Sequence, residues 1–273
     1  MLCSTVVLAL WLAAPAAPPA PAHALARARD AYNEEQYDTA IAEATAALSS
    51  PALADAARLV IARAHLERYR QSAEPADLHQ ARGALRAIDA SRLGGRDQAE
   101  LLVGLGEWLF FAERFGASAE LFANALARGD QVGVPRPARA RVLDWWASAT
   151  DRYAQRTPER RDALYTAMLD RLEAELQRDP GSAAANYWAV VAARGFGDLD
   201  RAWQSAMAGW VRAGLAPDRG AMLRADIDRF VLTAIIPERA RAAARGTQNE
   251  QQAAADAMVT EWERFKADWD GES

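Results

Sequence analysis

The sequence predicts an all-α protein, and three observations support that prediction. From Leu25 onward, apolar residues recur three and four positions apart, which is the spacing of one face of an α-helix. Alternating stretches of β-branched residues, which would indicate strands, are almost absent. Glycine, proline and capping residues interrupt the chain at intervals that leave room for about ten to twelve helices joined mostly by short loops.

The composition indicates a folded protein without a nucleic-acid partner. Of the 273 residues, 51% are hydrophobic and 25% are charged, which is ordinary for a globular chain. The net charge is −5, Lys266 is the single lysine, and no dense run of Lys or Arg offers a surface for phosphates. We therefore expect one large or two small domains that do not bind nucleic acid.

The N-terminus resembles a secretory signal. An apolar run from Leu2 to Ala14 is followed by a proline-rich stretch that ends in Ala22-His23-Ala24, and the run is too short for the roughly 20 residues of a membrane span. We expect residues 1–24 to be cleaved, which predicts a periplasmic or secreted protein with no integral membrane span. An uncleaved anchor is the alternative, because no Lys or Arg precedes the run. Cys3 is the only cysteine, so the mature chain would lack thiols and disulfides.

Local signals predict where the helices begin and end. A hydroxyl residue precedes proline at Ser50-Pro51 and at Thr157-Pro158, and Thr247 and Glu250 have capping-box spacing, so helices are expected to start at these three places. Breaks are expected near residues 71–75, 94–95, 129–137, 179–181, 214–220 and 245–246.

Two consecutive helices in the middle of the chain carry a motif of small and large residues. It reads Leu102-x2-Leu105-Gly106-x2-Leu109, then Phe115, Ser118-x3-Phe122 and Ala125-Leu126. This motif resembles the tetratricopeptide repeat, a pair of antiparallel helices in which small residues allow close backbone approach. The resemblance implies that Gly106 permits a helix contact. The alternative is a phosphate-binding loop at Gly104 and Gly106, but a third glycine and a P-loop lysine are missing.

Two other segments fit the same pattern less closely. One runs from Ala24 to Leu48 and the other from Asn186 to Trp210, and intervening helix pairs are expected at about Leu53–Ile88 and Ala138–Leu176. Together they imply an α-solenoid of tetratricopeptide-like helix-turn-helix repeats over residues 25–215.

Residues 216–273 are expected to form C-terminal helices that cap this solenoid. Residues 218–244 predict one or two helices interrupted at Pro237. A final amphipathic helix from Thr247 to Trp269 carries a stripe on one face that consists of Met258, Trp262, Phe265 and Trp269. A partner interface is the alternative interpretation of this stripe.

The resemblance also predicts which residues face the concave surface, where a partner would bind. They are Arg29, Tyr32 and Asn33 in the first unit, Glu100, Val103, Glu107, Phe110 and Phe111 in the central unit, and Tyr187 and Arg194 in the later unit. This mixture of rings and charges suits a peptide segment or an amphipathic ligand. The alternative is that they are solvated residues of a helix face. Trp145 and Trp146 point about 100° apart on a helix, so one of them can line a groove.

Candidate catalytic residues are sparse. Beyond the signal the chain has only His65 and His79, with no H-E-x-x-H, no G-x-S-x-G and no cluster at metal-ligand spacing. We therefore predict no enzyme, no catalytic residue, no cofactor and no metal.

Fold-level resemblance favours a docking adaptor that binds a protein or peptide partner of an envelope assembly or transport system. Two alternatives remain open. One is a periplasmic carrier that holds a small apolar ligand for a transporter, and the other is a helical glycosidase that uses a single glutamate.

Overall fold

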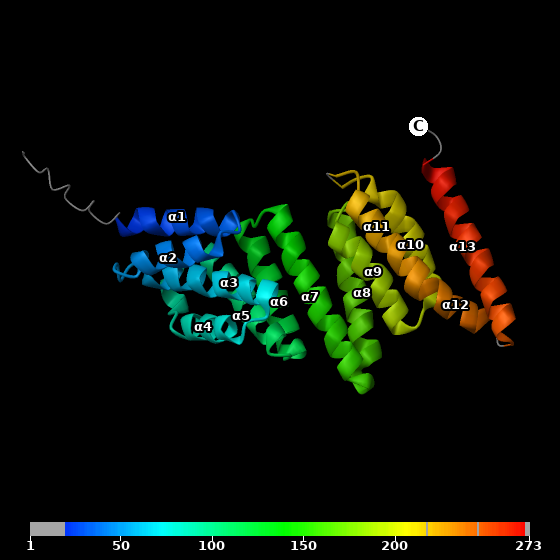
Figure 1. The fold of residues 1–273 in the computed structure, drawn as a ribbon, viewed down its shortest axis with the longest axis horizontal. Helices are drawn as coiled ribbons and strands as arrows, with labels where there is room; N and C mark the ends of the chain where they lie inside the picture. Colours follow the sequence, from blue (N-terminus) through cyan, green and yellow to red (C-terminus); the bar gives the residue numbers. More distant parts are fainter. Residues whose placement is uncertain (1–19, 217, 245, 271–273) are drawn as a thin grey trace, which may run out of the picture.

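The computed structural model describes residues 20–216, 218–244 and 246–270, and within these ranges the chain is helical without a strand (Figure 1). The all-α prediction is confirmed. The α-helices are α1 (Pro21–Asn33), α2 (Tyr37–Ala47), α3 (Ala54–Ser72), α4 (Pro75–Arg86), α5 (Gly95–Phe111), α6 (Phe115–Val132), α7 (Arg136–Arg156), α8 (Arg161–Arg178), α9 (Ala183–Phe196), α10 (Leu199–Ala213), α11 (Ala221–Phe230), α12 (Ile236–Ala243) and α13 (Gln248–Asp270).

The N-terminal signal prediction falls mainly on residues 1–19, which lie outside the described residues. Helix α1 begins at Pro21, so the expected cleavage point after Ala24 falls in its first turn. None of the helices in the described ranges is both long and apolar enough to cross a membrane.

Successive helices pack as pairs. Helices α1 and α2, α5 and α6, and α9 and α10 are in contact, and these pairs coincide with the three motif segments. Helices α3 and α4, and helices α7 and α8, occupy the two expected intervening segments, although α7 contacts α6 and α8 contacts α9 more extensively than α7 and α8 contact each other. The first helices also contact one another in order, α1 with α3, α3 with α5, α5 with α7 and α7 with α9. The result is an elongated array with α1 and α13 at opposite ends (Figure 1).

Gly106 lies in the contact between α5 and α6, as the motif predicts. A Cβ atom built on Gly106 would lie 2.8 Å from Cε1 of Phe122, and the hydroxyl of Ser118 donates a 2.8 Å hydrogen bond to the Gly106 carbonyl. Gly104 faces the preceding pair instead, where a Cβ would lie 3.0 Å from Cδ of Arg63. Both glycines lie inside α5, so neither belongs to a phosphate-binding loop.

The buried side chains form three clusters along the array. One joins α1, α2 and α3, a second joins α3, α4 and α5, and the largest extends from α5 to α13. Trp203 and Trp210, expected in the core, are buried in the largest cluster. Each cluster is formed by neighbouring helices, so packing between successive pairs stabilises the fold.

The C-terminal helices match part of their prediction. A π-helical turn at Val231–Ile235 connects α11 to α12 without a loop, and Pro237 lies in the first turn of α12. Such a turn accommodates a proline, which cannot donate a backbone hydrogen bond. In α13, Trp262 is 0% exposed and packs against Trp203 and Trp210, whereas Trp269 is 49% exposed. The predicted stripe therefore packs inward only in part.

One of the three expected helix caps forms as predicted. The amide of Thr247 donates to a carboxylate oxygen of Glu250 at 2.7 Å, and the Glu250 amide donates to the Thr247 hydroxyl at 3.4 Å. The other two side-chain caps do not form, although a helical turn does start at Pro158 and continues into α8. Helix α3 begins at Ala54, after a turn that follows Ser50, and the Thr157 hydroxyl donates to the Tyr153 carbonyl of α7 instead of capping α8.

Candidate functional site

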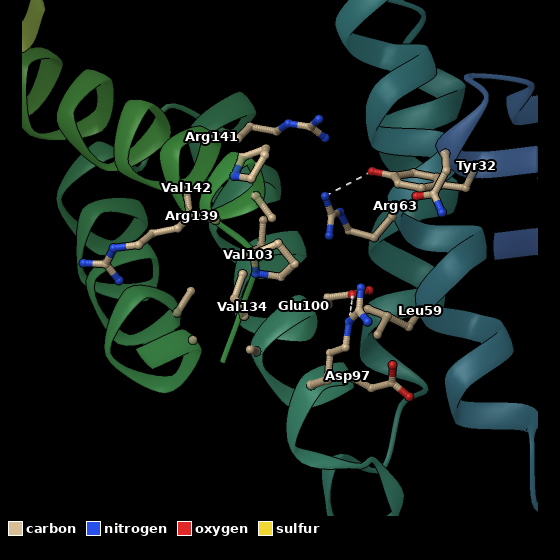
Figure 2. Close-up of a pocket in the computed structure, with 18 of the residues that line it drawn as sticks. Tyr32, Leu59, Arg63, Asp97, Glu100, Val103, Val134, Arg139, Arg141 and Val142 are labelled. Carbon is tan, nitrogen blue, oxygen red and sulfur yellow. Dashed lines mark hydrogen bonds and ion pairs between the residues drawn. The ribbon is translucent and has the colours of Figure 1, made fainter. Parts of the chain in front are cut away.

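The candidate site is a groove of about 590 Å³ between the first helices of the N-terminal pairs (Figure 2). Helices α1, α3 and α5 form one side, and α6, the loop before α7 and the N-terminal half of α7 form the other. The residues that line the groove include Arg29, Tyr32, Asn33, Leu59, Val60, Arg63, Arg96, Asp97, Glu100, Val103, Asp130, Val134, Arg139, Arg141, Val142 and Trp145.

The floor of the groove is apolar. Val60 and Val103 are buried on α3 and α5, and Val142 and Trp145 are half-buried on α7. The Trp145 ring stacks on Phe122 with centroids 5.9 Å apart and meets the edge of Phe110 at 4.9 Å. These contacts hold the indole in place, so one face of the groove is preorganised for an apolar group.

A buried ion pair closes one end of the groove. The Arg63 guanidinium donates from Nε to Oε2 of Glu107 at 3.1 Å and from Nη2 to the Tyr32 hydroxyl at 3.0 Å. Arg63 and Glu107 are both buried, so this network joins α1, α3 and α5 in a low-dielectric interior. Tyr32 and Arg63 line this end of the groove, whereas Glu107 lies behind Arg63 and is not part of the lining.

Burial and the charges of the network shift its pKa values. Burial raises the pKa of the Glu107 carboxyl, and the charge of Arg63 opposes that shift only in part. Burial lowers the pKa of Arg63, but Glu107 and the neighbouring groups raise it more, so the guanidinium stays charged. Burial also raises the pKa of Tyr32, which remains a neutral phenol.

Charged pairs line the rim. Arg29 donates to Asp97 at 3.0 Å and so links α1 to α5, and Arg139 lies 2.5 Å from Asp130 and 2.8 Å from Glu175. Arg141 makes no ion pair or side-chain hydrogen bond within the described residues. In Figure 2 its side chain extends across the groove toward Tyr32, whereas Arg139 turns away.

The structure brings some of the expected concave-face residues together. Arg29, Tyr32, Asn33, Glu100 and Val103, taken from two separate motif segments, all line the groove. These positions lie on one face of α1 and of α5, and the contacts from α1 to α3 and from α3 to α5 place the two faces side by side.

The remaining expected residues lie elsewhere. Glu107 is 1% exposed and bound to Arg63, which corrects the expectation that it faces a partner. Phe110 and Phe111 pack their edges against Trp145 instead of lining the groove. On α9, Tyr187 packs against Phe230, and the Arg194 Nε donates to Glu238 at 2.9 Å.

Sequence reasoning missed Arg63, Arg139 and Arg141. Arg63 carries a detectable signal, because it is the one charged residue in the segment from Leu59 to Ala64 of α3. Arg139 and Arg141 stand among several arginines of α7, and no local pattern separates them from solvated residues.

The described part of the chain offers little metal or catalytic chemistry. His65 Nδ1 lies 2.7 Å from Asp77 Oδ1 between α3 and α4, while His79 is exposed. No group of three or more His, Cys, Asp or Glu residues with the geometry to hold a metal occurs there.

Comparisons with family models, with curated proteins and with solved structures found no match to this chain.

Proposed function

We propose that this protein is a docking adaptor built from tetratricopeptide-like repeats, and that its groove binds an extended segment of a protein or peptide partner. Two features of the fold support a repeat array. The first helices of successive pairs contact one another from α1 to α9, and the Gly106, Ser118 and Phe122 contact joins α5 to α6 at the motif positions.

The groove chemistry carries the proposal. An apolar floor with Trp145 and Val103 provides contact area for apolar side chains of a partner, and the charged rim fixes the position of the partner segment along the groove. Arg141 is the one lining arginine that extends into the space without a partner in the described structure, so it is available to an incoming carboxylate or carbonyl.

The cellular setting is part of the proposal. The signal-like N-terminus supports export to the periplasm or beyond, and an exported docking adaptor would serve an envelope assembly or a transport system. This step depends on residues 1–24 and on fold-level analogy, so its test is separate from that of the groove.

One observation favours a second candidate, a carrier of a small amphipathic ligand. The volume of about 590 Å³ falls in the range of small-molecule pockets. We do not extend the proposal to a glycosidase, because Glu107, the buried glutamate behind Arg63, is bound by that arginine.

A position-specific photo-crosslinking experiment tests the adaptor. A photoreactive amino acid replaces Val142 in the groove, and the matched control replaces Ala46, an exposed residue of α2. We expect a discrete protein adduct in cells from position 142 alone.

Equal adducts at both positions, or no adduct at either, would contradict the adaptor. Native mass spectrometry of the purified chain tests the second candidate, the carrier of a small ligand. A co-purified small molecule that is lost when Val142→Trp fills the groove would favour the carrier.

A further inference from the structure

A second cleft, of about 710 Å³, lies between α6 and α8 and is separate from the groove. The N-terminal halves of α6 and α8 form its walls, and the C-terminal half of α7 forms its floor. The cleft is closed toward the other end of these helices, where Arg178 of α8 donates to Asp130 of α6 at 3.0 Å and Arg139 bonds Glu175 at 2.8 Å. It is therefore wedge-shaped and open toward the loop between α7 and α8.

The inner surface of this cleft is apolar and hollowed by small residues. Phe115, Trp146, Leu164 and Met168 supply the large side chains. Alanines line both walls where larger residues would fill the space, at Ala117, Ala119, Ala123 and Ala167. On α6 the lining runs from Phe115 to Ala123, a length of about 12 Å or roughly two helical turns.

The open end of the cleft is positively charged. Arg114 and Arg160 occupy the N-cap positions of α6 and α8, where an oxygen-bearing side chain is usual, and neither helix has a side-chain cap. The N-terminal end of α6 and the two guanidinium groups therefore place positive charge at the same opening.

Neither Arg114 nor Arg160 is paired with a carboxylate among the described residues. Glu113 is bound by Arg156 at 3.0 Å, and Glu120 lines the wall on α6. Arg160 donates only to the Tyr153 hydroxyl, at 2.8 Å. The Arg114 side chain has no ion pair or hydrogen bond to any residue that the structure describes.

We propose that this cleft binds a short amphipathic helix of a partner protein, with acidic residues in the last turn of that helix. An incoming helix that lies antiparallel to α6 and α8 places apolar residues on Phe115 and Met168. Its C-terminal end, which carries the negative end of the helix dipole, then lies against Arg114 and Arg160. This charge complementarity selects the direction and the acidic character of the partner helix.

Selection from an unbiased library of displayed segments of about 12 residues tests the proposal with the full chain as bait. We expect the enriched segments to share an apolar helical stripe and acidic residues at the C-terminal end. The same segments are then measured by fluorescence anisotropy against the double variant Arg114→Glu/Arg160→Glu. We expect about tenfold weaker binding, because two attractive charges at the cleft opening become repulsive.

Two further variants serve as controls for this measurement. Arg86→Glu makes the same kind of charge change on an exposed site of α4 and should leave the affinity unchanged. Ala167→Trp fills the cleft from an exposed position and should abolish binding while the circular dichroism spectrum stays that of the wild type.

Three outcomes would overturn the proposal. Enriched segments that lack acidic C-terminal ends would refute the charge argument. Equal loss of affinity in Arg114→Glu/Arg160→Glu and Arg86→Glu would show that only net charge matters. Complete displacement by inorganic phosphate would identify a small-anion site in place of a helix-binding cleft.

Discussion

The ion pair between Arg63 and Glu107 allows the most direct test of how the groove is built. Its side chains are 10% and 2% exposed, so both charges are almost fully removed from water. Replacement of Glu107 by methionine leaves the Tyr32 hydroxyl as the hydrogen-bond partner of the Arg63 guanidinium among the described residues. Loss of one member of a buried pair typically costs about 3–5 kcal/mol, because the remaining charge is uncompensated.

Replacement of both residues gives the opposite expectation. In Arg63→Met/Glu107→Met no charge remains buried, and apolar side chains of similar volume fill the site. Such replacements are neutral or stabilising by about 1–4 kcal/mol in other proteins. We therefore expect the double variant to be more stable than Glu107→Met alone by at least about 2 kcal/mol.

Urea denaturation followed by circular dichroism measures the free energy of unfolding of the wild type, both single variants and the double variant. A cost below about 1 kcal/mol for Glu107→Met would show that the pair is solvated, contrary to its burial. A double variant as unstable as the sum of the single variants would show that the two side chains act independently.

Three further predictions address packing, the C-terminal cap and pH. Gly106→Ala should destabilise the fold by about 1–3 kcal/mol, because its Cβ would lie 2.8 Å from the buried Phe122 ring. The control Gly83→Ala, whose Cβ meets nothing within 4 Å, should be neutral or stabilising, and thermal unfolding of both variants measures the difference. Trp262→Ala should cost about 3–5 kcal/mol and make α13 the first site of limited proteolysis, and unchanged protease resistance would contradict its role in capping. Burial raises the pKa of Glu107 above 4.5, so the folded chain binds this proton more tightly than the unfolded chain. Relative to Glu107→Gln, the wild type should therefore gain stability as the pH falls from neutral toward 4.5, and urea titrations that show the opposite sign would refute the assignment.

Local patterns predicted the helices and their pairing because those features depend on nearby residues. Apolar spacing identified the helical class, and the motif around Gly106 identified the contact with Ser118 and Phe122 that the structure contains. Helix starts were less predictable. Thr247 forms its capping box, whereas Thr157 turns back to a carbonyl of the preceding helix, and a hydroxyl can bond in either direction.

The candidate site was predictable only where residue position on a helix decides exposure. Tyr32 and Glu100 line the groove because first helices of neighbouring pairs lie side by side. Glu107 has the same helical phase as Glu100 but is buried, because Arg63 from another pair fills the space in front of it. The sequence carries no rule that joins residues 44 positions apart.

The sequence by itself determined that this chain is helical, where several breaks between helices fall, and which small residues permit close contact between neighbouring helices. These are short-range effects of backbone geometry and side-chain size. Only the tertiary structure decided where the groove ends, which arginines are paired, and that a second cleft opens between α6 and α8. Burial and charge pairing depend on distances between helices that are far apart in the sequence, and packing alone sets those distances.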